Sequence, residues 1–126
     1  MHDVLVVEDE FALGEFLRRL LEREKLPFRL AESGPQALGL AEEGWPGVVL
    51  LDMTLPGLLD GWQVWDGLRL RCGGRTLRVI VFAAGLNSED ELEARRRSAW
   101  AILRKPVART RLVEILRGAL ADQIYD

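Results

Sequence analysis

The sequence predicts an α/β protein, a doubly wound, five-stranded parallel sheet with five helices. Five short apolar runs alternate with longer segments in which apolar residues recur at helical spacing. The first, third and fourth runs are continuously apolar and rich in branched aliphatic residues, as strands are when helices cover both faces of a sheet. The repeated alternation of strand and helix indicates right-handed crossovers between parallel strands. We expect the strand order 2-1-3-4-5 and a ligand site at the carboxyl ends of the central strands.

The predicted strands are short and differ in their residue pattern. The first, third and fourth are rich in valine, leucine and isoleucine, whereas the second alternates between apolar and polar residues, as an edge strand does. The predicted strands cover residues 4–7, 28–31, 48–51, 79–83 and 100–103.

Each predicted helix carries its apolar residues on one stripe. In the first helix, Leu13, Leu17 and Leu20 follow one another at spacings of four and three residues. The fourth helix opens with Ser88, and Glu91 at the third helical position predicts a capping box between the two. The predicted helices cover residues 11–24, 35–43, 61–71, 88–97 and 109–120.

Composition limits the classes of function open to the chain. Its 126 residues are 48% hydrophobic and 29% charged, which is typical of a soluble globular protein of one domain. The formal net charge of −3 argues against a dedicated nucleic-acid-binding protein. Cys72 has no second cysteine to pair with, and the sequence shows neither a signal peptide nor a membrane-spanning run. We expect a cytoplasmic protein with no direct nucleic-acid or membrane partner.

Ionisable residues follow three of the predicted strands. Glu8 and Asp9 follow the first strand, Asp52 follows the third, and Lys105 comes shortly after the fifth. The first and third strands are neighbours in the predicted order, so their three carboxylates would repel one another unless a cation intervened. Mg²⁺ suits such a site, because it takes one or two carboxylates and leaves room for phosphate oxygens. With Lys105 as a further phosphate-binding charge, the arrangement suits in-line phosphoryl transfer.

Each of these features also has a simpler interpretation on its own. The acidic run at 8–10 suits the cap of the first helix, Asp52 suits a turn, and Lys105 suits an ordinary surface position. The conjunction favours a functional site, because one ionisable feature follows each of three apolar strands and all of them lie at one edge of the sheet.

Three segments make the sequence similar to the receiver domains of bacterial two-component response regulators. VLVVEDE at 4–10 resembles the first strand and acidic pair of that family, LLDMTLPG at 50–57 its phosphorylation segment, and LRKP at 103–106 its lysine-proline loop. The resemblance extends over essentially the whole chain. It implies a flavodoxin-like fold, as in the chemotaxis response regulators. From the residues that remain after the last predicted helix, we expect a receiver domain at 1–121, a short tail at 122–126 and no output domain.

The resemblance implies a role for each residue of the predicted site. Asp52 would be the phosphoacceptor and a Mg²⁺ ligand, Asp9 a direct Mg²⁺ ligand, and Glu8 a ligand that acts partly through water. The backbone carbonyl of Thr54 would be a further ligand, and Lys105 would pair with the phosphoryl group. The phosphodonor would be a sensor histidine kinase, a phosphotransfer protein or a small acyl phosphate. Catalysis would be limited to the domain's own phosphorylation and dephosphorylation.

Two positions depart from the pattern of the family. Where the family has Thr or Ser at the end of the fourth strand, this chain has Ala83, and where the family has Tyr or Phe on the fifth strand, it has Ile102. In the family, the hydroxyl of that Thr or Ser hydrogen-bonds the phosphoryl group. A hydrogen bond to a charged group is worth about 1.5–3 kcal/mol, so its absence here removes a sizeable part of the free energy that would switch the domain between its two states. We expect phosphorylation to survive and signal propagation to be weaker or to follow another route.

Two other functions stay open. A receiver-like binding module whose output ignores phosphorylation is consistent with Ala83 and Ile102. A small phosphatase with an aspartyl-phosphate intermediate is the other, although such enzymes usually keep a second acid near the nucleophile and Met53 and Thr54 supply none.

A partner surface is predicted near the end of the chain. Alternate residues of the fifth strand share one face, and tryptophan and arginine are frequent in interface hot spots. An unknown downstream protein or a second copy of the chain would dock there, across the predicted helix 88–97, strand 100–103 and helix 109–120. Alternatively, Trp100 packs over the sheet edge and the arginines complement a helix dipole. The candidate residues are Arg95, Arg96, Trp100, Ile102 and Arg104.

Overall fold

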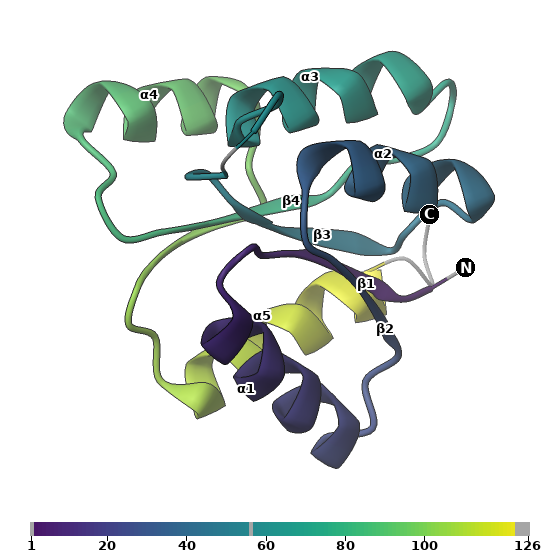
Figure 1. Ribbon diagram of the computed structural model, residues 1–126, viewed down its shortest axis with the longest axis vertical. Helices are drawn as coiled ribbons and strands as arrows, with labels where there is room; N and C mark the ends of the chain where they lie inside the picture. Colours follow the sequence, from purple (N-terminus) through teal and green to yellow (C-terminus); the bar gives the residue numbers. More distant parts are fainter. Residues whose placement is uncertain (1, 56, 123–126) are drawn as a thin grey trace.

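A parallel sheet of five strands forms the centre of the protein, as Figure 1 shows. The computed structural model describes residues 2–55 and 57–122. The strand order is β2-β1-β3-β4-β5, and every neighbouring pair is parallel. The strands are β1 (Val4–Val7), β2 (Phe28–Ala31), β3 (Val48–Asp52), β4 (Val79–Ala83) and β5 (Ala101–Arg104). The helices are α1 (Phe11–Arg23), α2 (Gly34–Glu43), α3 (Gly61–Arg71), α4 (Ser88–Arg96) and α5 (Arg109–Asp122).

Helices cover both faces of the sheet and give the protein three layers. α2, α3 and α4 lie on one face, and α1 and α5 lie on the other (Figure 1). Because successive strand residues point to opposite faces, each inner strand contributes to both cores. Leu5 and Leu51 pack in the core beneath α2, α3 and α4, whereas Val6 and Leu50 pack in the core beneath α1 and α5. The predicted α/β class, doubly wound arrangement and strand order are therefore confirmed.

The bounds of the elements lie within one or two residues of the predicted ones. β5 begins one residue later than predicted, so Trp100 precedes the strand. α5 continues to Asp122, the first residue of the predicted tail, and the rest of that tail, 123–126, lies outside the described residues. Within residues 2–55 and 57–122, no helix has the length and apolar content to cross a membrane.

The capping box of α4 lies one residue earlier than predicted. Asn87 Oδ1 accepts the Asp90 N–H at 2.8 Å, and Asp90 Oδ2 accepts the Asn87 N–H at 3.3 Å. The prediction of a box between Ser88 and Glu91 was therefore wrong, although the helix does begin at Ser88. Asn and Ser cap helices about equally well, and acids occupy both candidate third positions, so the extended backbone at Asn87 decides the register.

Strand register brings the ends of β1, β3 and β5 to one edge of the sheet. Glu8 and Asp52 come directly after the last residue pair that joins β1 to β3. The Lys105 N–H donates to the Ala83 carbonyl at 2.9 Å, which places the residue after β5 at this same edge. The residues that the sequence places after separate strands are therefore neighbours in space.

Gly61 allows α3 to begin close against the end of β3. A Cβ atom at this position would lie 2.5 Å from Met53 Cα and 2.8 Å from the Asp52 carbonyl oxygen. Both are backbone atoms, so a side-chain movement would not relieve the contact. The first turn of α3 thus supports the backbone that carries Asp52, and only glycine permits this close approach.

Candidate functional site

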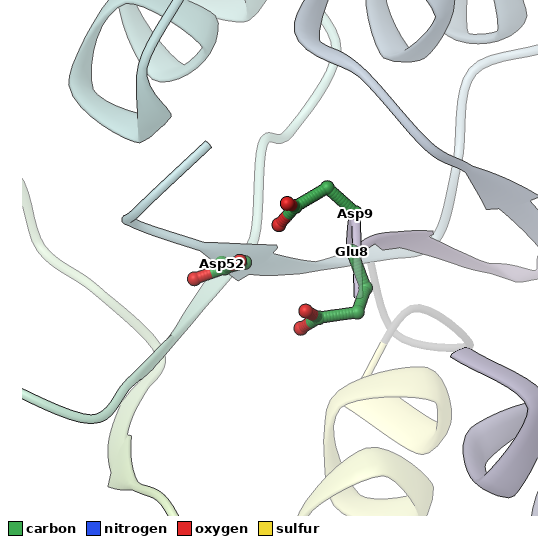
Figure 2. Close-up of side chains that lie close together, drawn as sticks. All are labelled: Glu8, Asp9 and Asp52. Carbon is green, nitrogen blue, oxygen red and sulfur yellow. The ribbon is translucent and has the colours of Figure 1, made fainter. Parts of the chain in front are cut away.

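Three carboxylates meet at the carboxyl edge of the sheet. Glu8 and Asp9 follow β1, Asp52 ends β3, and Figure 2 shows their side chains around a common space. One oxygen of each carboxylate lies within 4.8 Å of the other two. Glu8 and Asp52 are buried, with 2% and 4% of their surface exposed, whereas Asp9 is open to solvent. We call this cluster the acidic triad.

Lys105 joins the acidic triad from the far end of the chain. Its Nζ donates to Glu8 Oε2 at 3.0 Å and lies 3.6 Å from Asp52 Oδ1. Only 18% of its side chain is exposed, so Lys105 does not occupy the ordinary surface position that was the simpler interpretation of the sequence. Figure 2 shows where the three acids lie relative to one another. The predicted meeting of Glu8, Asp9, Asp52 and Lys105 at one edge therefore occurs in the structure.

Backbone N–H groups orient the two buried acids. The Thr54 N–H donates to Asp52 Oδ1 at 3.0 Å, and the Glu10 N–H donates to Glu8 Oε1 at 3.3 Å. Glu10 is the N-cap of α1 and its side chain makes no capping hydrogen bond within the described part of the chain. The acidic run at 8–10 therefore does not serve as a side-chain cap. The role of the Thr54 carbonyl as a metal ligand stays a prediction.

Burial raises the pKa of Asp52 from its ordinary value of 3.8 to about 7. The Thr54 N–H opposes this rise in pKa, the negative charge of Glu8 adds to it, and the Lys105 ammonium opposes it. Asp9 raises the pKa further through a hydrogen bond. Three acids around one amine leave the cleft with an excess of negative potential, which favours a bound cation.

The donor atoms of the acidic triad fit Mg²⁺. This ion prefers oxygen ligands at about 2.0–2.1 Å in octahedral geometry, so opposite ligands lie about 4.2 Å apart. The carboxylate oxygens of Glu8, Asp9 and Asp52, within 4.8 Å of one another, come close to that span. Since Mg²⁺ usually keeps several waters, a water can bridge to one of the three carboxylates. The triad is consistent with a magnesium site of this kind.

The two unusual positions, Ala83 and Ile102, lie on the neighbouring strands β4 and β5 and belong to the same core. Ala83 ends β4, is buried, and directly precedes the loop to α4 that contains Leu86. Ile102 is half-buried on β5 and packs against the core beneath α2, α3 and α4. Neither side chain offers a hydroxyl or an aromatic ring. In this protein the contact from β5 to the α4 region is made by Arg104, which donates to the Leu86 carbonyl at 2.7 Å and to Glu91 at 2.8 Å.

Four of the five predicted surface residues line one groove. Arg95, Trp100, Ile102 and Arg104 border a cavity of about 500 Å³ between α4, β5 and α5. Trp100 is 41% exposed, and both arginines form ion pairs with Glu91. The fifth residue does not belong to this groove, because it borders a separate hollow between α3 and α4. That residue is Arg96.

Sequence reasoning missed two contacts, one between Phe82 and Lys105 and one between Arg97 and the tryptophans of α3. Phe82 places its ring centroid 4.9 Å from the Lys105 Nζ, although in the sequence it is indistinguishable from other core residues of β4. Arg97 places its guanidinium 5.0 Å and 5.2 Å from the ring centroids of Trp62 and Trp65. A signal for the second contact existed, since Trp62 and Trp65 are spaced to share one helix face.

Comparison with known proteins agrees with this geometry. The family model described as the response regulator receiver domain matches residues 4–117. The transcriptional regulatory protein PcoR of Escherichia coli is 34% identical over 95% of this chain, which spans 52% of PcoR. An uncharacterised 14.6 kDa protein of Leptolyngbya boryana is 30% identical over 91% of this chain and 87% of its own length. The chain thus spans about half of the first relative and most of the second.

A solved structure shows the same likeness. The receiver domain of NtrX from Brucella abortus superposes with a TM-score of 0.84 at 30% sequence identity, over 94% of this chain and 98% of that one. A superposition over nearly the whole of both chains shows that the two share one fold. In this chain, the acidic triad lies at the sheet edge where parallel α/β folds bind ligands.

Proposed function

This chain belongs to the response regulator receiver domain family, and from that membership we propose that it accepts a phosphoryl group on Asp52 in a Mg²⁺-dependent reaction. Receiver domains are generally non-enzymatic signalling modules of two-component systems, and the family implies a histidine kinase as a partner. One observation carries the proposal. The buried Asp52 carboxylate shares a cleft with two further acids and lies 3.6 Å from the Lys105 amine.

The proposed reaction is an in-line displacement at phosphorus. An oxygen of Asp52 forms a bond to phosphorus, the phosphorus–nitrogen bond of a phosphohistidine breaks, and the imidazole leaves with the bonding electron pair and gains a proton. The Lys105 ammonium balances charge on the phosphoryl oxygens. Asp9, Glu8 and the Thr54 carbonyl would hold the magnesium ion, which supplies further charge neutralisation when bound. Loss of the phosphoryl group to water would return the domain to its initial state.

The surroundings of the cleft suit a protein as phosphodonor. Phe11 and Leu58 are 78% and 86% exposed and belong to the segments that follow β1 and β3, the two strands that bear the acids. Exposed apolar side chains at the rim of a cleft supply contact area to a docking protein. We assign the phosphodonor to a sensor histidine kinase or a phosphotransfer protein, and we place the reaction in the cytoplasm.

The direct test is to weigh the intact protein after incubation with acetyl phosphate and Mg²⁺. The expected result is the mass of one added phosphoryl group in the wild type and none in Asp52→Asn. Asp60→Asn is the matched control, because Asp60 caps α3 outside the cleft and Asn caps helices equally well. The control should acquire the adduct as the wild type does. An adduct that persists in Asp52→Asn, or no adduct in the wild type, would refute the proposal.

A second candidate is a receiver-like module whose output does not depend on phosphorylation. Ala83 and Ile102 favour it, because the residues that usually couple the phosphoryl group to α4 lack their functional groups here. Amide hydrogen exchange of residues 84–104, with and without beryllofluoride and Mg²⁺, separates the two functions. A change in exchange supports phosphorylation-dependent signalling. Unchanged exchange in a protein that carries the ligand supports the second candidate.

The groove between α4, β5 and α5 is the proposed output surface. Trp100 and Ile102 offer apolar contact area, and Arg104 connects the groove to the start of α4. We propose that a downstream protein binds there, or that a second copy of the chain forms a homodimer through the same elements. Onward transfer of the phosphoryl group from Asp52 is the other route for the signal. Sedimentation velocity with and without beryllofluoride distinguishes dimerisation from binding to a different protein.

A further inference from the structure

Phe82 brings an aromatic ring against the amine of the predicted phosphate-binding lysine. Its ring centroid lies 4.9 Å from the Lys105 Nζ, and the residue is paired with Asp52 in the register of β3 with β4. Only 4% of Phe82 is exposed, so the ring meets Lys105 from the buried side of the cleft. The Lys105 Nζ is thus bounded by a ring and by the carboxylates of Glu8 and Asp52.

The electrostatics of an aromatic face make this contact attractive. An ammonium within about 6 Å of a ring centroid is attracted by the ring quadrupole, more strongly where water is excluded. Because a ring presents no lone pair to a metal ion or a phosphoryl group, it restrains the amine without competing for its hydrogen-bonding partners. Ala83, which ends the strand that carries Phe82, has no hydroxyl to share the binding of phosphoryl oxygens with Lys105.

We propose that Phe82 is a positioning residue for phosphoryl transfer, and that its ring holds the Lys105 ammonium beside Asp52, where the phosphoryl group arrives. This inference rests on the proposed function. The competing explanation is that Phe82 only fills the core beneath α1 and α5, to which Ile80 and Leu103 also belong. The two explanations differ in what happens when the ring is removed and the apolar volume is kept.

Three variants separate positioning from packing. Phe82→Leu removes the ring and keeps an apolar side chain, whereas Phe82→Tyr keeps the ring. Ile80→Val trims a buried residue of the same strand and the same core, two positions from Phe82, without altering the ring above Lys105. Thermal melting of each variant shows whether it folds.

The first measurement places the two side chains in the metal-free protein. Nuclear Overhauser contacts between the Phe82 ring protons and the Lys105 methylene next to Nζ are expected in the wild type and in Ile80→Val. In Phe82→Tyr the same methylene should contact the tyrosine ring. Absence of the contact in the wild type would overturn the inference without reference to phosphorylation.

The second measurement separates magnesium binding from the phosphorylation rate. At saturating Mg²⁺, Phe82→Leu should acquire the acetyl-phosphate adduct about three- to tenfold more slowly than the wild type, while its Mg²⁺ dissociation constant stays within about twofold. Phe82→Tyr should restore most of the rate, and Ile80→Val should leave it unchanged.

The remaining outcomes refute either the positioning role of Phe82 or the proposed function. A wild-type rate in Phe82→Leu, an equal slowing in Ile80→Val, a Phe82→Tyr variant as slow as Phe82→Leu, or a parallel loss of Mg²⁺ affinity would show that Phe82 acts through packing alone. A wild type that never acquires the adduct would refute the proposed function itself. The failure of the inference and the failure of the function are therefore distinguishable.

Discussion

At the scale of single residues, Asp52 lies where burial and charge act against each other. Its carboxylate is held by the Thr54 N–H and approached by the Lys105 amine, yet burial and two neighbouring acids favour its protonated form. The residue that is proposed to react is therefore also a source of instability in the metal-free protein. This conflict between function and stability is common at functional sites.

The conflict predicts that Asp52→Asn stabilises the metal-free protein in a pH-dependent manner. The pKa of Asp52 is about 7 in the folded state and 3.8 ordinarily, so the folded state binds this proton more tightly than the unfolded state. The stability that this tighter proton binding contributes to the wild type is therefore fully present below about pH 4 and is lost as the pH rises through 7. In EDTA at pH 8, Asp52→Asn should raise the free energy of unfolding by about 2–4 kcal/mol, and the difference should become small at pH 4. Urea denaturation at both pH values checks this, and a variant less stable than the wild type at pH 8 would contradict it.

At the scale of helices and strands, Arg97 joins α4 to α3. Its guanidinium lies over Trp62 and Trp65 and forms 2.9 Å ion pairs with Asp66 and Glu93. Only 14% of the Arg97 side chain is exposed. The C-terminal end of α4 is therefore not uniformly solvated, because the side chain of its C-cap residue, Arg97, is shielded against α3, whereas Arg95 and Arg96 are exposed.

Removing the Arg97 side chain should lower the free energy of unfolding more than removing its exposed neighbour Arg96. We expect Arg97→Ala to lower the free energy of unfolding by about 1–2 kcal/mol, because a shielded cation–π contact and its ion pairs are lost together. Arg96→Ala is the matched control. Its side chain is 66% exposed and should change the free energy by less than about 0.5 kcal/mol. Urea denaturation curves measure both, and equal effects of the two variants would argue against a special role for Arg97.

At the scale of the whole molecule, the site exists only because separate parts of the chain converge. Glu8 and Lys105 are 97 residues apart in the sequence and form a 3.0 Å hydrogen bond. A ligand that binds these groups in the folded state finds no preformed site in the unfolded chain. Folding and metal binding are therefore linked.

The linkage predicts that Mg²⁺ stabilises the whole domain. At a free concentration of about 100 times the dissociation constant, the free energy of unfolding should increase by about 2.7 kcal/mol relative to EDTA. Asp9→Asn should lose most of this gain, since Asp9 is a proposed direct ligand, and Asp60→Asn should keep it. Thermal melting with and without Mg²⁺ gives the comparison. The same increase in Asp9→Asn as in the wild type would place the ion elsewhere.

Much of the fold and the site followed from residue types and their order along the chain. Apolar periodicity indicated the alternating strands and helices, and three ionisable features at strand ends indicated the acidic triad with Lys105. These properties can be predicted because a strand's pattern is local and because parallel strands end at a common edge. The exact cap of α4 escaped prediction, since Asn87 and Ser88 are both good caps and only the backbone path distinguishes them.

By itself, then, the sequence determined the α/β class, the strand order and the acids and amine that would meet. Tertiary structure alone decided which side chains touch. Phe82 over Lys105, Arg97 rather than Arg96 against α3, and the close approach of Gly61 to Met53 all depend on strand register, side-chain rotamer and helix packing. Those quantities are set by contacts between segments far apart in the chain, and no local pattern of residues encodes them.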